Sequence, residues 1–108
     1  MMFNEHAIDQ FITDFKLKQP DGVIGFAAKI IFHINGYTKE RYTEVQILKG
    51  QDLNAIYLIA PDLPFEDLPD TFILKEFTFE YVPGHRLEIT PKKERQNCIE
   101  IIPVVISE

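Results

Sequence analysis

The sequence predicts a small, mainly β domain, built as an antiparallel sandwich or a partly open barrel of about seven strands. Nine of its 108 residues are Phe and Ile recurs throughout, and aromatic and β-branched side chains suit a pleated, half-buried surface. Apolar and polar residues alternate in several short runs, which indicates strands with one buried face. Seven Pro and five Gly supply turns between many short elements.

The length sets the domain count. A chain of 108 residues can build one hydrophobic core but is too short for two. We therefore expect a single domain over residues 1–108, in which residues 1–11 form a loose or helical lead-in.

Residues 4–18 carry two competing patterns. One is a helical stripe at i, i+3, i+4 and i+7, formed by Ile8, Phe11, Ile12 and Phe15. The other is a strand-like alternation of Thr13, Phe15 and Leu17 with charged residues. We expect a short helix followed by a strand from about Ile12, and then a tight hairpin turn at residues 19–22.

The clearest strand runs from Val23 to Asn35, and both of its faces are largely apolar. Asn35-Gly36 is a strong hairpin signal, and we expect the charged residues 39–41 to lengthen that connection. Further strands are expected at 42–49, 55–60, 71–82, 86–90 and 98–107.

Two prolines add detail to the predicted structure of the second half of the chain. Pro83-Gly84 predicts a type II turn, in which Gly supplies the positive φ. Pro103 lies inside the last expected strand, which favours an edge position or a bulge there.

Charge and cysteine content limit the partners and the compartment. The net charge of −6 disfavours, without excluding, binding to a phosphate backbone. The single cysteine, Cys98, is too few for an internal disulfide or a Cys-based zinc site. Because the N-terminus lacks signal-peptide features and no apolar run approaches about 20 residues, we expect a cytoplasmic protein without a membrane partner.

Catalytic motifs are missing from the sequence. The three histidines, His6, His33 and His85, lack metal-ligand spacing, and the only serine, Ser107, is near the C-terminus. We read Cys98 as a small buried residue and not as a nucleophile. The expectation is a protein that is not an enzyme, with no catalytic residue, no metal site and no cofactor.

Two groups of residues are candidate binding sites. The first is an acidic, proline-spaced loop at 61–70, for a basic protein partner, and its proposed contacts are Asp62, Phe65, Glu66, Asp67 and Asp70. The second is a set of bases that would contact phosphates if they met on one face: Lys16, Lys18, Arg86, Lys92, Lys93 and Arg95.

Residues 12–61 resemble the SpoVG family of bacterial septation and sporulation regulators. The resemblance is carried by an opening Ile12-Thr-Asp-Phe-Lys-Leu-Lys18 segment, an Asp21-Gly22 turn, the Phe26-Ala-Ala-Lys-Ile30 segment, and a strand–Gly–strand unit that ends at Pro61. It implies a small dimer that binds DNA or RNA through a basic segment after that proline. The chain departs from the family at this point, because acidic residues begin at Asp62.

We therefore expect a non-catalytic protein-binding module, such as an acidic inhibitor or accessory protein, in a monomeric or homodimeric form. The first alternative is a SpoVG-like dimeric regulator that binds nucleic acid. The second is a small-ligand binder, or an enzyme, with a pocket inside the β fold.

Overall fold

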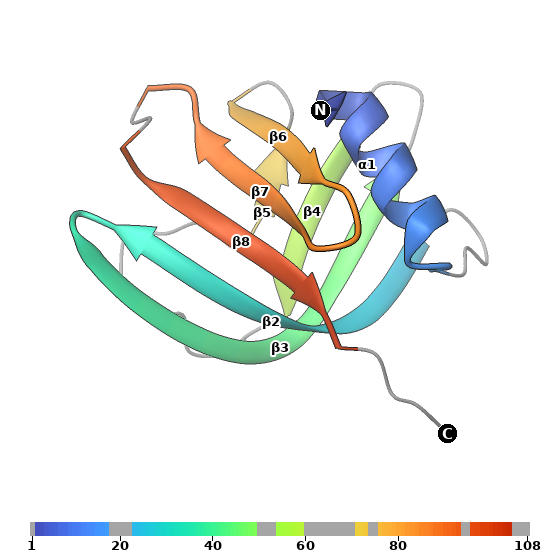
Figure 1. Cartoon of the computed structure of the whole chain (residues 1–108), viewed down its shortest axis with the longest axis horizontal. Coiled ribbons are helices and arrows are strands. Elements are labelled where there is room, and N and C mark those ends of the chain that lie inside the picture. Colours follow the sequence, from blue (N-terminus) through green and yellow to red (C-terminus); the bar gives the residue numbers. More distant parts are fainter. Residues whose placement is uncertain are drawn as a thin grey trace.

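The structure is a computed structural model (Figure 1), and the regular elements of its described part are one helix and one sheet of eight strands. It describes residues 2–17, 23–49, 54–59, 71–73, 76–93 and 96–104. In chain order the elements are β1 (Met2–Phe3), α1 (Asn4–Asp14), β2 (Val23–Ile34), β3 (Tyr37–Lys49), β4 (Asn54–Ile59), β5 (Thr71–Ile73), β6 (Phe77–Val82), β7 (Arg86–Pro91) and β8 (Cys98–Pro103).

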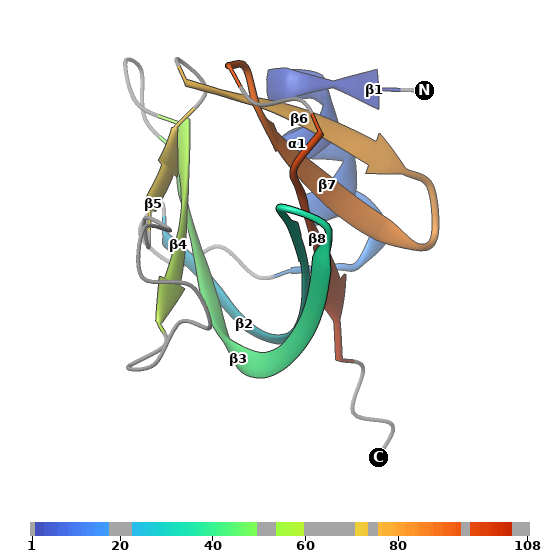
Figure 2. The ribbon, with the colours of Figure 1, turned by 90° about the vertical axis from the view of Figure 1, so that its left-hand side faces the viewer.

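The strands form a single curled sheet. Its order is β1-β6-β7-β8-β2-β3-β4-β5, and every neighbouring pair is antiparallel. Figure 2 shows a trough with β4 and β5 on one side, β6, β7 and β8 on the other, and β2 and β3 along the bottom. The predicted mainly β class with an N-terminal helix is confirmed, and of the two predicted architectures the structure has the open barrel.

The core fills the inner face of this trough. Side chains on alternate positions of β2, β6, β7, β8 and the second half of β3 are buried, as period-2 alternation requires. The fully buried residues with the largest side chains are Tyr81, Phe11, Phe32, Phe79, Ile8, Ile24, Ile30, Ile47, Ile56 and Leu87. Burial of each such side chain contributes about 1.5–3 kcal/mol, so the inner face supplies the main driving force for the curl.

The predicted strand from Ile12 is wrong, because the helix continues through this region. The amide of Leu17 donates to the carbonyl of Ile12 at 3.0 Å and the amide of Lys16 donates to that of Thr13 at 3.2 Å, while Lys16 has a φ of 52°. This is a Schellman ending with a left-handed residue after the last turn. The alternation of Thr13, Phe15 and Leu17 reflects this helix ending, and the expected turn at 19–22 lies outside the described residues.

The predicted helical stripe is confirmed, and it closes one end of the trough. Ile8 and Phe11 are completely buried. The ring of Phe11 lies 5.8 Å from the ring of Phe26 in β2 and 5.8 Å from that of Tyr81 in β6. One helical side chain therefore joins the bottom of the trough to its β6 wall.

The connection between β2 and β3 is shorter than expected. Ile34 pairs with Tyr37, so Asn35 and Gly36 alone make the turn, with φ values of 51° and 83°. Two left-handed residues form a type I′ turn, which matches the twist of the flanking strands. Residues 39–41 therefore belong to β3, because the minimal turn lets pairing start at Tyr37.

The expected strand over 71–82 is divided in two. β5 pairs with β4 at one end of the sheet order, whereas β6 pairs with β7 and β1 at the other. A single straight strand cannot reach both walls of the trough, so the chain leaves one wall and crosses to the other between β5 and β6 (Figure 2).

The predicted type II turn at Pro83-Gly84 is confirmed by the φ of Gly84, 76°, and by a 3.0 Å bond from the His85 amide to the Val82 carbonyl. The last strand is not at an edge, because β8 lies between β7 and β2. Pro103 fits because the next amide, Val104, donates to Ala27 in β2. The nitrogen of Pro103 therefore points away from β2, toward the side of β7. Pro103 lies past the last residue of β8 that pairs with β7, Ile101, so its missing amide hydrogen removes no bond between these strands.

Tyr81 links three parts of the fold. Its hydroxyl donates to Oδ2 of Asp14 at 2.7 Å, and it accepts the Gly84 amide at 3.0 Å. Burial raises the pKa of Tyr81 above its usual value, so the hydroxyl keeps its proton. It thereby ties the end of α1 to β6 and to the turn that follows.

We expect Tyr81→Phe to lower the free energy of unfolding by about 1–2 kcal/mol, because the Gly84 amide and Asp14 lose a shared partner. Urea denaturation measures this change. Tyr42→Phe is the matched control, since Tyr42 is exposed and its replacement should change stability by less than about 0.5 kcal/mol. Equal stability of the two variants would contradict a structural role for the Tyr81 hydroxyl.

Candidate functional site

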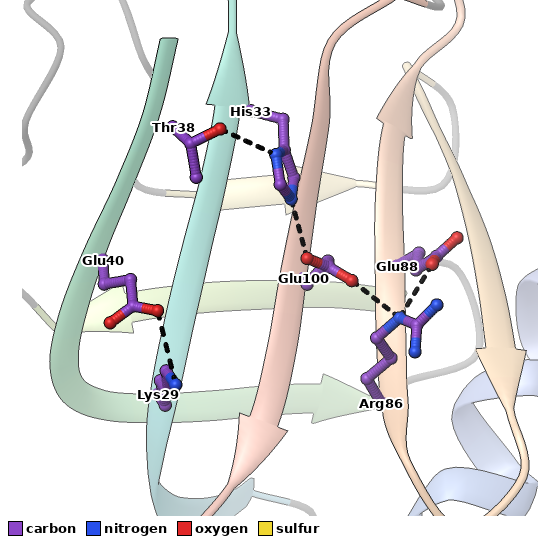
Figure 3. Close-up of polar contacts among 7 residues, drawn as sticks. All are labelled: Lys29, His33, Thr38, Glu40, Arg86, Glu88 and Glu100. Atoms are coloured by element: carbon purple, nitrogen blue, oxygen red, sulfur yellow. Dashed lines mark hydrogen bonds and ion pairs between the residues drawn. The ribbon is translucent and has the colours of Figure 1, made fainter.

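A cluster of polar side chains covers the outer face of the sheet, opposite the core (Figure 3). It comes from positions that alternate with the buried residues of β2, β3, β7 and β8. This outer-face cluster consists of Lys29, His33, Thr38, Glu40, Arg86, Glu88 and Glu100.

Three carboxylates form a row across the β6–β7–β8 wall. Glu80 pairs with Glu88, and Glu88 pairs with Glu100. Like charges directly opposite each other on a sheet destabilise it. The side chain of Glu100 is only 17% exposed, so water screens this repulsion incompletely and a nearby cation is needed.

Arg86 supplies that cation. Its Nε lies 2.9 Å from Oε1 of Glu88 and 2.7 Å from Oε1 of Glu100 (Figure 3). The hydrogen bond to Glu88 raises the pKa of Arg86 above its usual value, against the opposing effect of burial. One guanidinium thus bridges the like-charged pair and holds β7 against β8.

His33 occupies the second oxygen of Glu100. Its Nε2 lies 2.7 Å from Oε2 of Glu100 and its Nδ1 lies 3.2 Å from Oγ1 of Thr38. Because a carboxylate only accepts, Nε2 carries the proton, and in the neutral ring Nδ1 accepts from the Thr38 hydroxyl. Both ring nitrogens are therefore engaged, and they connect β8, β2 and β3.

Cys98 lies beside this cluster, since it is the register partner of His33. Desolvation, followed by the charges of Glu88 and Glu100, raises its pKa to about 11. A nucleophilic cysteine needs the opposite shift, because the thiolate is the reactive form. The arrangement brings His33, a carboxylate and Cys98 together, but its chemistry suits a cross-strand network and not an activated nucleophile.

In the described part of the chain, no three His, Cys, Asp or Glu residues are placed so that they could share a metal ion. The described helix is neither long nor apolar enough to cross a membrane.

A second feature of the sheet is the open edge of β3, which we define as Tyr37–Thr43. Among the described residues, β4 pairs with β3 from Glu44 to Lys49. The segment before Glu44 has β2 on one side and no described strand on the other. It projects beyond the core, because all of residues 37–42 are exposed.

Hydrogen-bond phase decides which groups of this edge face outward. The bond from the Val104 amide to the Ala27 carbonyl shows that Ala27 faces β8. Backbone groups alternate in direction along a strand, so the amides and carbonyls of Lys29, Ile31 and His33 also face β8. The amides and carbonyls of their β3 partners therefore face away from β2. Those partners are Thr38, Glu40 and Tyr42.

Two tyrosines mark the ends of the open edge. Tyr37 is 68% exposed and Tyr42 is 72% exposed, the highest values among the large apolar side chains of the described residues. They lie on opposite faces, since side chains alternate along a strand and the step from Tyr37 to Tyr42 is an odd number of positions. Exposed tyrosines are enriched at the centres of protein interfaces.

The sequence-predicted site residues are placed as follows. The acidic loop with Asp62, Phe65, Glu66, Asp67 and Asp70 lies outside the described residues, as do Lys18 and Arg95. Lys16 follows the end of α1, Arg86 begins β7, and Lys92 and Lys93 follow the other end of β7. Arg86 is engaged by two carboxylates, and the whole of β7 separates it from Lys92.

Sequence reasoning did not find the outer-face cluster or the open edge. The sequence left open a meeting in space of His33 or His85 with Cys98 or a carboxylate, but it could not say which distant strands pair, because local patterns do not carry that information. The Asn35-Gly36 turn was the available signal for the edge, since a minimal turn implies that β3 starts at Tyr37.

We expect Arg86→Met to lower the free energy of unfolding by about 1–2 kcal/mol, because Glu88 and Glu100 then face each other without a cation. Denaturation at low and at high salt measures this. The loss should shrink near 1 M salt, which screens the repulsion, and adding Glu88→Gln should restore stability. Lys93→Met is the control, and an equal loss in that variant would contradict the bridging role of Arg86.

We expect Cys98 to react slowly with iodoacetamide at pH 8. A pKa of about 11 in place of 9.0 lowers the thiolate fraction about 100-fold. The folded chain should therefore be alkylated at least about 100-fold more slowly than the urea-unfolded chain, and its rate should keep rising above pH 9. Similar rates in both states would show that the thiol is neither buried nor facing the two carboxylates.

No protein-family model matches the chain, and neither a curated protein nor a solved structure shows a significant match to it. The likeness of residues 12–61 to the SpoVG family therefore stays a prediction from the sequence.

Proposed function

We propose that this chain is a non-catalytic protein-binding module whose binding surface is the open edge of β3. The observation that carries the proposal is the pair of exposed tyrosines, Tyr37 and Tyr42, on a stretch of β3 that pairs with β2 on one side and with no described strand on the other. A strand edge offers main-chain hydrogen bonds for affinity, and its alternate side chains provide specificity.

The chemistry of the outer-face cluster supports a binding role over a catalytic one. Its histidine, arginine and carboxylates are joined to one another, and its thiol has a pKa raised to about 11. These groups stiffen the sheet that presents the edge, because the His33 ring bonds to Thr38, the first residue of the edge that faces outward.

The acidic loop at 61–70 remains a second proposed contact for the same function. In an acidic chain with a net charge of −6, it would meet a basic surface of the partner. An inhibitor or an accessory protein would use both surfaces, one for a strand and one for a charged patch.

We expect the double variant Tyr37→Ala, Tyr42→Ala to bind its partner at least about 10-fold more weakly than the wild type, since exposed aromatic anchors carry much of an interface's binding energy. The partner is captured from source-cell extract with the tagged wild-type chain, identified, purified and titrated by calorimetry against each variant. Folding should be unchanged, because both side chains are exposed.

His85→Ala is the matched control, since His85 is exposed in the β6–β7 turn and away from this edge. Unchanged affinity in the tyrosine double variant would refute the edge as the binding surface. If the Glu66→Lys, Asp67→Lys variant alone lost the partner, binding would be assigned to the acidic loop.

A further inference from the structure

The outer face of the sheet continues beyond the outer-face cluster into an exposed region centred on Ala27, two residues before Lys29 in β2. Glu44 of β3 is the register partner of Ala27. On the other side of Ala27, the amide of Val104, which follows β8, donates to its carbonyl at 3.0 Å. Tyr42 is two residues before Glu44, so their side chains share this face. The exposed patch consists of Gly25, Ala27, Tyr42, Glu44 and Val104, all of which are exposed.

The exposed patch is mostly apolar. Three large apolar residues are exposed in the described structure, and two of them, Tyr42 and Val104, belong to the patch. The β2 residues of the patch are Gly25 and Ala27, which have no side chain or only a methyl group. Exposed apolar side chains that gather on one face, in place of being scattered, favour an interaction surface.

The patch also holds a carboxylate that the described residues do not neutralise. Glu40 and Glu44 flank Tyr42, each two residues away on the same face. Nζ of Lys29 lies 3.3 Å from Oε1 of Glu40 (Figure 3). Within the described part of the chain, no ion pair or side-chain hydrogen bond involves Glu44. Its Oε1 lies over β2, 3.4 Å from the position that a Cβ on Gly25 would take.

The outer face around the patch is acidic, which selects the charge of a partner. Along β2, β3, β6, β7 and β8, its outward-facing cations are Lys29 and Arg86. Its carboxylates outnumber them and are Glu40, Glu44, Glu80, Glu88 and Glu100. A positively charged partner is therefore favoured over a negatively charged one.

We propose that the exposed patch binds an arginine side chain of a basic partner protein, with the guanidinium against the Tyr42 ring and the Glu44 carboxylate. A planar guanidinium stacks on an aromatic ring and bonds to a carboxylate through paired donors, whereas the ammonium of lysine is a point charge. The methylene stem of the arginine packs on Val104. This inference rests on the proposed function, because Tyr42 is one of its two tyrosines, and it names the partner's chemistry.

The test uses a synthetic peptide, Thr-Val-Arg-Val-Thr with blocked ends, and its counterpart with citrulline in place of arginine. Citrulline keeps the shape of the side chain and removes its charge. In an NMR titration at low salt, we expect the arginine peptide to shift the amide signals of Ala27, Tyr42 and Glu44 saturably. The citrulline peptide should bind at least about 10-fold more weakly, and high salt should weaken the binding of the arginine peptide.

Variants of the patch separate the two contacts. Glu44→Gln should remove most of the preference for arginine over citrulline, because it deletes the carboxylate and keeps the shape. Glu76→Gln is the matched control, since Glu76 is exposed just before β6 and its replacement removes the same charge elsewhere. Tyr42→Leu should weaken binding of the arginine peptide, whereas Tyr42→Phe keeps the ring and should bind it like the wild type.

Three outcomes would overturn the inference. Equal binding of the two peptides, or no binding of either, would exclude a guanidinium site. Arginine-peptide binding that Glu44→Gln leaves unchanged would place the arginine elsewhere. Shifts of the same amide signals on raising the protein concentration without peptide would identify a second copy as the occupant. In each case the proposed function would stand if the tyrosine double variant lost the natural partner while Glu44→Gln kept it.

Discussion

The two-residue turn at Asn35-Gly36 is the constraint on which the arrangement of the whole sheet depends. It fixes the register of β2 against β3, and that register decides which side chains enter the trough and which backbone groups face β8, β4 or no described strand. A shift of one residue would move every apolar side chain of β3 to the outer face. Val45 and Ile47 are completely buried in the present register, so the core penalises any slip, and the turn and the core enforce the same phase.

A different register, that of β6, β7 and β8, places like charges opposite each other on the outer face. Pairing of β6, β7 and β8 places Glu80, Glu88 and Glu100 in one row, and repulsion between their charges opposes the pairing of these strands. Arg86 and His33 offset it by binding Glu100 from two sides. As a result, the side chains of Arg86 and His33 are both bonded to carboxylates of the sheet. The part of the described structure where a histidine, an arginine and a thiol come together is therefore one in which the two basic groups already have partners.

Local patterns in the sequence predict the elements well where a buried face repeats regularly. β2 and β7 are predicted to within about one residue, because apolar residues recur at every second position from Ile24 to Ile34 and from Leu87 to Ile89. The Pro83-Gly84 pair itself predicts the type II turn. The prediction of a strand at the end of the helix is wrong, because the Schellman turn spaces Thr13, Phe15 and Leu17 like a strand. The division of 71–82 and the cluster around Glu100 depend on which distant strands become neighbours, and no local pattern carries that information.

The edge strands explain how a sheet with this topology leaves one stretch available without inviting its own copies. β1 and β5, which end the sheet order, contain only two and three residues, too few to template further pairing. The longer open edge of β3 carries Lys39, Glu40 and Arg41, and charges on an edge oppose indiscriminate pairing.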